Sequence, residues 1–188
     1  MSEEAQQRLR EALKTVAVVL KEGDTPFALA GSYGLWARGA PEPVHDVDFV
    51  VAEEDAARVE RLLADHGLEV QQPPEDWLFK VWQGDAMVDV LFRALRVPVT
   101  REQLADVDCL EVESVLMPVL SATELMAHKL GALEEHACDL GKVLPAARAV
   151  REQVDWERVA EETGENPFAD AALHLLRRLG VAPERPNG

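Results

Sequence analysis

The sequence predicts an α+β fold in which a strand-rich first part is followed by a wholly helical second part. Short apolar runs bounded by Gly and Pro are typical of strands and alternate with amphipathic helical periods in the first part, while only helical periods follow it. We therefore predict a core with an N-terminal helix over residues 1–118, a helical region over 119–181 and a flexible tail over 182–188. A chain of 188 residues is long enough for one good core with a helical annex.

The overall composition restricts the classes of function. The formal net charge is -16, from 19 basic and 35 acidic residues, whereas nucleic-acid binders usually carry a basic face. This acidity favours a small or cationic partner. There is no apolar run long enough to span a bilayer and no basic-then-apolar leader, so we expect a cytoplasmic protein that has no membrane contact. In that compartment Cys109 and Cys138 are expected as free thiols rather than as a disulfide.

The N-terminal elements lead to one acidic strand. A helical period covers residues 3–22, and a buried strand follows at Phe27–Ala30. A Gly-Ser turn then opens a short helix from Tyr33 to about Arg38, and a loop leads to Asp46 and Asp48. After the acidic strand we expect a helix over residues 53–66 and a strand over 68–71.

Asp46 and Asp48 stand two residues apart on this second strand. Side chains at i and i+2 point the same way, so the two carboxylates project together while Val47, Phe49 and Val51 face a core. Like charges held side by side repel unless a cation or a shared proton relieves them. The pattern predicts a divalent metal, and oxygen ligands favour Mg²⁺ or Mn²⁺.

A third carboxylate, Asp89, lies inside an apolar run over residues 87–92. Gly84-Asp85 separates this run from residues 77–83 and indicates a hairpin. A charge inside such a strand is costly unless it is paired or metal-bound, so we assign Asp89 to the same site; the alternative is an edge-strand residue that faces water. Lys80 and Arg93, on or beside these strands, either neutralise phosphates or are simply solvated.

The Gly-Ser turn has a functional and a structural interpretation. Gly31 lets the backbone approach a ligand closely, and Ser32 offers a hydroxyl near the amides of the helix N-terminus, which attract phosphate. The alternative is that Gly31 relieves crowding and Ser32 caps the helix. His45 points away from Asp46; it contacts a base or an acceptor, or it is structural.

The later elements are predicted from caps and breakers. A strand is expected over 109–115, and Ser121 with Glu124 forms a capping box that starts a helix reaching Leu133. Pro145 indicates that the next helix begins near Val143 or Leu144, or is kinked there. Two more helices are expected to follow, with Asp155 and Asp170 as caps, the last over 171–179.

Taken together, the Gly31-Ser32 pair, the Asp46-x-Asp48 strand and the lone Asp89, 41 positions after Asp48, resemble the nucleotidyltransferase superfamily. This superfamily has the DNA polymerase β-like fold and includes antibiotic, minimal and AbiEii/MenT-type nucleotidyltransferases. The resemblance implies a mixed β-sheet flanked by helices and followed by a C-terminal helical bundle.

The helical part resembles the segment that follows the core in the AbiEii/MenT-type and minimal enzymes. There the resemblance implies that Lys129 contacts nucleotide phosphates and that Asp139 serves the active-site region; the alternative for both is a solvated helix face. The chain departs from the pattern before Asp139, where residues 134–138 replace an arginine-rich stretch, and this goes against an anionic acceptor. His136, Cys138 and Asp139 fit no standard zinc spacing.

We therefore predict a Mg²⁺-dependent nucleotidyltransferase that moves NMP from an NTP such as ATP to a hydroxyl acceptor and releases pyrophosphate. The predicted catalytic and metal-binding residues are Asp46, Asp48 and Asp89, and the nucleotide-binding residues are Gly31, Ser32, Lys129 and Asp139. One alternative is an inactive nucleotide-binding sensor or partner module. Another is the toxin of a toxin–antitoxin pair that modifies tRNA and has an antitoxin partner. The acceptor, the base and a homodimeric state are left open.

Overall fold

The computed structural model describes residues 3–105 and 107–184, and its centre is a mixed seven-stranded sheet. The strand order is β3-β4-β5-β2-β1-β9-β8. The pairs β2–β5 and β1–β9 are parallel, and the other neighbouring pairs are antiparallel. The strands of this sheet are β1 (Phe27–Ala30), β2 (Val47–Val51), β3 (Glu69–Gln71), β4 (Leu78–Gln83), β5 (Ala86–Leu91), β8 (Asp108–Val112) and β9 (Val115–Val119).

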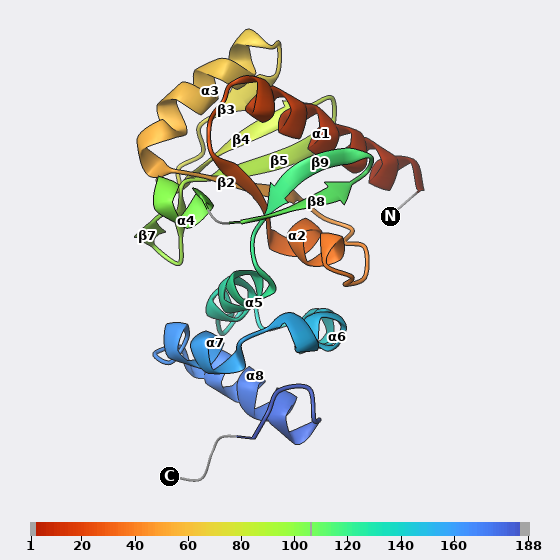
Figure 1. Ribbon diagram of the computed structural model, residues 1–188, viewed down its shortest axis with the longest axis vertical. Coiled ribbons are helices and arrows are strands. Elements are labelled where there is room, and N and C mark those ends of the chain that lie inside the picture. The colour runs from red at the N-terminus through yellow and green to blue at the C-terminus, as the bar shows by residue number, and fades with distance from the viewer. Residues whose placement is uncertain (1–2, 106, 185–188) are drawn as a thin grey trace.

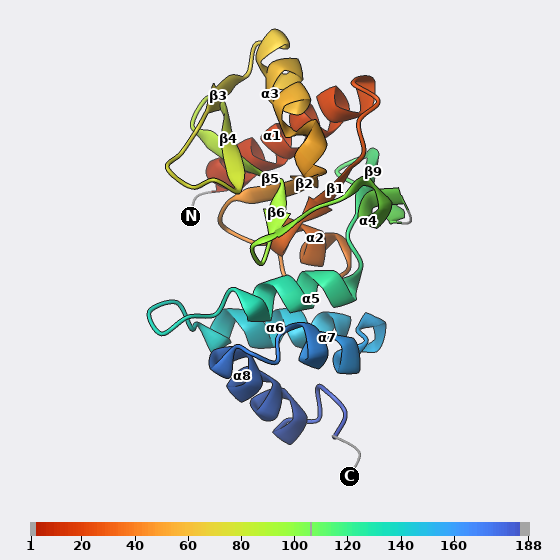
Figure 2. The same ribbon diagram turned by 90° about the vertical axis from the view of Figure 1, so that its left-hand side faces the viewer.

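Helices cover both faces of the sheet (Figures 1 and 2). Helices α1 and α3 lie on one face, and α5 to α8 form a separate half on the other, with α2 beside the sheet. The α-helices are α1 (Glu3–Glu22), α2 (Gly31–Ala37), α3 (Ala56–Asp65), α4 (Arg101–Ala105), α5 (Ala122–Gly131), α6 (Leu140–Val150), α7 (Trp156–Glu162) and α8 (Pro167–Arg178). The two short 3₁₀ turns are Glu53–Asp55 and Arg151–Gln153, and a small second sheet pairs β6 (Arg93–Ala94) with β7 (Val97–Pro98).

The alternation of side chains along β2 separates two hydrophobic cores. Val47, Phe49 and Val51 are buried with α1 and α3, as predicted, while Val50 is buried with the helical half. Each strand side chain points to the face opposite its neighbours, so Asp48 lies on the same face of the sheet as Val50. The acidic strand therefore presents its carboxylate toward the helical half rather than toward α1.

The predicted α+β fold, with a mixed sheet flanked by helices and a following helical bundle, is confirmed. The predicted division into 1–118, 119–181 and 182–188 stays a prediction. Residues 185–188 of the proposed tail lie outside the described residues, and Ala182 is buried against the helical core. No helix in residues 3–105 and 107–184 combines the length and the apolar character needed to span a bilayer.

Three local predictions are wrong, namely those for the strand over 109–115, the start of α6 and the start of the last helix. The strand expected over 109–115 is a hairpin of β8 and β9, because Glu113 and Ser114 turn the chain with left-handed φ values of 49° and 64°. Helix α6 begins at Leu140 rather than near Val143, because the Asp139 side chain accepts a hydrogen bond from the Gly141 amide. Pro145 consequently lies inside this helix.

The last helix also begins earlier than predicted. It begins at Pro167 rather than at residue 171, because the Asn166 side chain accepts hydrogen bonds from the amides of Phe168 and Ala169. Proline is favoured in the first turn of a helix, where its missing N–H costs nothing. Asp170 therefore lies in the first turn and is not the cap.

The capping box that begins α5 is present as predicted. Ser121 Oγ accepts a hydrogen bond from the Glu124 amide over 3.1 Å, and the Glu124 carboxylate accepts one from the Ser121 amide over 3.2 Å. Since Ser121 follows β9 almost directly, this cap fixes where the helical half leaves the sheet.

We expect Ser121→Ala to lower the free energy of unfolding by about 1 kcal/mol, because an amide at the start of α5 loses its acceptor. Urea denaturation of wild type and variant measures the difference. Ser121→Thr is the matched control, since it keeps the hydroxyl acceptor and should lose much less. Equal losses in the two variants would show that the hydroxyl does not act as a cap.

Candidate active site

Asp48 and Asp89 are neighbours on adjacent strands. Strands β2 and β5 run parallel, and their register pairs Asp48 directly with Asp89. Asp46 lies one residue before β2 and is exposed, so it belongs to the loop that enters the strand rather than to the strand itself. All three carboxylates lie within electrostatic range of one another, because Asp46 and Asp89 both act on the ionisation of Asp48.

The close spacing of these carboxylates shows in their pKa values. Burial, the Asp89 carboxylate and the Asp46 carboxylate together raise the pKa of Asp48 to about 7, although Lys129 and Lys80 act in the opposite direction. Burial also raises the pKa of Asp89, against the hydrogen bond that it accepts from Lys80. A divalent cation would relieve this repulsion, and carboxylate oxygens are the donors that Mg²⁺ prefers.

The donor chemistry thus fits a hard divalent cation, but the side chains are not preassembled around one position. Over the described ranges, no three His, Cys, Asp or Glu side chains are grouped closely enough to hold a metal ion. Lys80 Nζ lies 2.9 Å from Asp89 Oδ1 and supplies the nearest positive charge to that carboxylate. A metal at Asp48 and Asp89 would therefore share Asp89 with Lys80.

Gly31 lies against the Asp48 carboxylate. Strand β1 is antiparallel to β2 with Ala30 opposite Asp48, so the next residue, Gly31, reaches the carboxylate as the chain turns into α2. Gly31 has a φ of +56°, and a Cβ built on it would overlap the Asp48 side chain. Both the backbone conformation and the space therefore require glycine. The interpretation that Gly31 relieves crowding is correct, and the crowding group is Asp48 itself.

Ser32 contacts the helical half rather than capping α2. The N-cap of α2 is Ala30, and no side chain caps it, so the N-cap interpretation of Ser32 is wrong. Instead Lys129 Nζ, on α5, donates a hydrogen bond to Ser32 Oγ over 3.4 Å. Burial lowers the pKa of Lys129, and the Asp48 carboxylate opposes that shift. Lys129 therefore lies close to both the Gly-Ser turn and the carboxylate.

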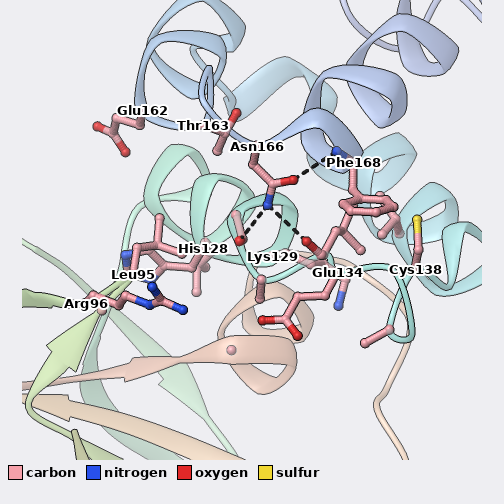
Figure 3. A pocket seen from close by; sticks show the side chains of 18 of the residues that line it. Leu95, Arg96, His128, Lys129, Glu134, Cys138, Glu162, Thr163, Asn166 and Phe168 are labelled. Carbon is pink, nitrogen blue, oxygen red and sulfur yellow. Dashed lines mark hydrogen bonds between the residues drawn. The ribbon is translucent and has the colours of Figure 1, made fainter.

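A cavity of about 1630 Å³ opens between the sheet and the helical half. Four predicted residues from the two halves line it next to one another, namely Gly31, Ser32, Asp48 and Lys129, and Asp139 lines it from the start of α6. Figure 3 shows the helical wall, where the Asn166 amide donates hydrogen bonds to the backbone carbonyls of Gly131 and Leu133. Asp46 and Asp89 are not among the lining residues, although Asp89 is paired with Asp48 on the neighbouring strand.

The cavity also contains residues whose roles were left open. His136 and Cys138 line it and are exposed, and both cysteines of the chain are free. Lys142 Nζ lies 3.7 Å from Asp139 on the exposed start of α6. His45 is exposed and is not among the lining residues, so the structure gives it no contact with the cavity.

Sequence reasoning missed or left undecided several charged residues of the site. Lys80 pairs with Asp89, and the symmetric hairpin around Gly84-Asp85 could have predicted that partner, since the register also pairs Gln83 with Ala86. Arg93 is held by Glu53 and Asp76 at 2.7 and 3.1 Å. His128, whose pKa is lowered by burial, and Arg96 line the cavity, and no sequence motif marks either of them.

The mixed sheet, its two parallel neighbours β2 and β5, and the helical half behind them form the nucleotidyltransferase fold, so the resemblance drawn from the sequence is confirmed. A model of the aminoglycoside-2''-adenylyltransferase family matches residues 12–140. The chain belongs to this family and is a nucleotidyltransferase.

Solved structures agree on the fold. The antibiotic-resistance factor ANT(2'')-Ia in solution is 16% identical, with 90% of this chain and 97% of that chain covered and a TM-score of 0.60. Crystalline ANT(2'')-Ia in complex with adenylyl-2''-tobramycin is 14% identical, with 86% and 97% covered and a TM-score of 0.58. The lincomycin-bound lincosamide adenylyltransferase LnuA is 13% identical, with 72% and 94% covered and a TM-score of 0.52. The comparison with curated protein sequences returns no match.

We expect Gly31→Ala to reduce nucleotidyl transfer by about 100-fold or more, because the new methyl group would displace the Asp48 carboxylate. Gly39→Ala is the matched control: Gly39 also has a positive φ, of +104°, but no heavy atom lies within 4 Å of its Cβ position. Both variants carry the backbone strain, and only Gly31→Ala disturbs the carboxylate. Turnover measured on folded protein, checked by circular dichroism, separates the two effects; equal losses would contradict this role for Gly31.

We expect the unfolding free energy of wild type, measured without divalent metal, to fall as the pH rises from about 4 to about 7. Unfolded Asp48 ionises near its ordinary value of 3.8, but folded Asp48 keeps its proton up to about pH 7, so the folded state binds more protons in this window. Asp48→Asn removes that loss and should be more stable than wild type at pH 8 by a few kcal/mol, at about 1.4 kcal/mol per pH unit. Urea denaturation at pH 5 and pH 8 in EDTA measures both curves, and parallel curves would contradict the shift.

Proposed function

We propose that this enzyme transfers NMP from an NTP, with ATP as the expected donor, to a hydroxyl group of a small cationic acceptor and releases pyrophosphate. The observation that carries the proposal is the pairing of Asp48 with Asp89 on parallel strands, beside a cavity whose opposite wall supplies Lys129. The family supports an adenylyl donor, and ANT(2'')-Ia, with the same fold, is found with adenylyl-2''-tobramycin.

In the proposed reaction, Asp46, Asp48 and Asp89 would hold Mg²⁺ or Mn²⁺. When bound, the metal would neutralise phosphate charge and stabilise the entering and leaving oxygens. The acceptor hydroxyl oxygen bonds to the α-phosphorus, the bond to the oxygen that bridges toward the β-phosphorus breaks, and pyrophosphate leaves. Asp89 would accept the proton that the acceptor hydroxyl loses. The hydrogen bond from Lys80 favours the ionised form of this carboxylate, although burial raises its pKa overall.

The nucleotide would be positioned by groups from both halves of the protein. The Gly31-Ser32 turn brings backbone amides and a hydroxyl to the cavity, and Lys129 brings an ammonium within 3.4 Å of that hydroxyl. Phosphoryl and nucleotidyl transfer need alignment and charge stabilisation more than covalent help from the protein. Asp139 serves the same region from the start of α6, where it also raises the pKa of Lys129 against burial.

The cationic acceptor is proposed from the charge of the cavity wall. Carboxylates from the helical half line the cavity, namely Glu134, Glu135, Asp139, Glu162 and Glu165. Aminated sugars and similar polyamines carry positive charge at neutral pH, and a carboxylate-lined wall attracts them and repels nucleic acid. This wall supports an aminoglycoside-like acceptor and goes against tRNA.

We expect label from α-³²P-ATP to appear on an aminoglycoside such as tobramycin when the protein is incubated with Mg²⁺ and separate pools of aminoglycosides, lincosamides, RNA and protein. The Asp46→Ala/Asp48→Ala variant is the control and should transfer nothing. Thin-layer and gel analysis identify the labelled product, and the other α-labelled NTPs test the base.

Each other result has a distinct meaning. Label on tRNA would replace the proposal with the toxin alternative. Metal-dependent NTP binding without transfer to any pool would replace it with the inactive nucleotide-binding module. Absence of both transfer and binding would contradict the assignment of the three aspartates.

A further inference from the structure

We propose that Arg96, at the tip of the β6–β7 hairpin, binds the β- and γ-phosphates of the nucleotide and thus the pyrophosphate that leaves. The inference rests on the proposed function and adds a residue to it that no motif marks. Arg96 is exposed and lines the cavity from the side of the sheet. Figure 3 shows its side chain extending from the hairpin into the cavity.

Most of the positively charged side chains that line the cavity already have a partner. The lining includes four Arg or Lys residues, namely Arg93, Arg96, Lys129 and Lys142. Arg93 is held by Glu53 and Asp76, Lys142 lies near Asp139, and Lys129 lies close to both Ser32 and Asp48. Within residues 3–105 and 107–184, Arg96 makes no hydrogen bond or ion pair. Its guanidinium is therefore available to a ligand.

The hairpin that carries Arg96 is held in a defined position. Leu95 and Arg96 form the turn between β6 and β7 with left-handed φ values of 49° and 68°. The same geometry occurs at Glu113–Ser114, so the turn type alone marks no site. What distinguishes this hairpin is that Leu95 packs on Gly131 at the end of α5: a Cβ on Gly131 would lie 2.6 Å from the Leu95 side chain. The turn is thus docked against the helical half across the cavity.

The negative charge and the geometry of a triphosphate also favour a guanidinium at this position. Carboxylates line much of the cavity, so a triphosphate needs cations to be held there. Lys129 and the Gly31-Ser32 turn lie next to Asp48, where the α-phosphate must react. Arg96 reaches the cavity from the separate hairpin and is placed for the far end of the triphosphate. A guanidinium also matches phosphate geometry with two parallel hydrogen bonds, which a lysine cannot reproduce.

The test measures binding without transfer. Wild-type protein, Arg96→Gln and Arg96→Lys are titrated calorimetrically, with Mg²⁺ present, with three probes: AMP, tripolyphosphate and the ATP analogue whose α,β-bridging oxygen is replaced by methylene. We expect Arg96→Gln to bind the ATP analogue and tripolyphosphate about ten- to a hundred-fold more weakly, as for loss of a charged hydrogen-bonded contact. AMP affinity should be unchanged, and Arg96→Lys should lie between.

The matched control is Arg61→Gln, which removes the same charge from an exposed position of α3 that is not among the residues lining the cavity. It should bind all three probes as wild type does. Steady-state kinetics add a second readout: Arg96→Gln should raise KM for ATP and weaken inhibition by pyrophosphate, with KM for the acceptor unchanged.

Failure of this inference is distinguishable from failure of the proposed function. If wild type binds the analogue and transfers label but Arg96→Gln binds all probes equally well, Arg96 is not a phosphate ligand. A rise in KM for the acceptor alone, or a fall in AMP affinity equal to that for tripolyphosphate, also overturns it. If wild type neither binds the analogue nor transfers label, the proposed function itself is wrong, and the inference falls with it.

Discussion

The close approach of the Gly31 backbone to the Asp48 carboxylate is the constraint on which the site depends. Antiparallel pairing of β1 with β2 places Ala30 opposite Asp48, so the chain must turn into α2 directly over an acidic side chain. Only a residue without Cβ fits there, and its left-handed φ is also one that glycine adopts freely. A single contact thereby fixes the start of α2, the position of Ser32 and the orientation of the carboxylate.

The same arrangement is electrostatically unfavourable without ligands. Asp48 is half-buried beside Asp89 and near Asp46, and its pKa of about 7 expresses that cost. Lys80 and Lys129 offset part of it, one from each side of the carboxylate pair: Lys80 comes from the neighbouring strand β4, and Lys129 from the helical half. Strain of this kind is typical of functional sites, where binding of a cation or substrate recovers the energy. In the proposed function, bound ligands would complete the charge distribution that the fold stabilises.

Much of this structure was predictable because neighbouring residues encode it. The pairing of strands that are far apart in the sequence was not predictable. The strand that carries Asp48, the Ser121 cap and the turn after Phe27–Ala30 depend on neighbouring residues, and the sequence shows them directly, although it placed Asp46 on the strand rather than in the loop before it. By contrast, β9 lies between β1 and β8 in a parallel pairing with β1 that bridges about 90 residues, which no local pattern encodes. The family resemblance implied only that Lys129 contacts nucleotide phosphates, and neither its hydrogen bond to Ser32 nor the docking of Leu95 on Gly131 had a signal in the sequence.

The acidic composition of the chain has a physical consequence for the substrates that the cavity attracts. A strongly negative wall is a poor surface for a triphosphate but a good one for a polyamine, and the proposed reaction requires both in one cavity. The lining cations lie at separate points, with Lys129 beside Ser32 on the helical side and Arg96 on the hairpin, while carboxylates outnumber cations on the helical wall. The bound nucleotide would add negative charge to that wall, so donor and acceptor would attract each other in the ternary complex. Binding of the anionic donor should therefore strengthen binding of the cationic acceptor, and charge complementarity between the two substrates would help to align them.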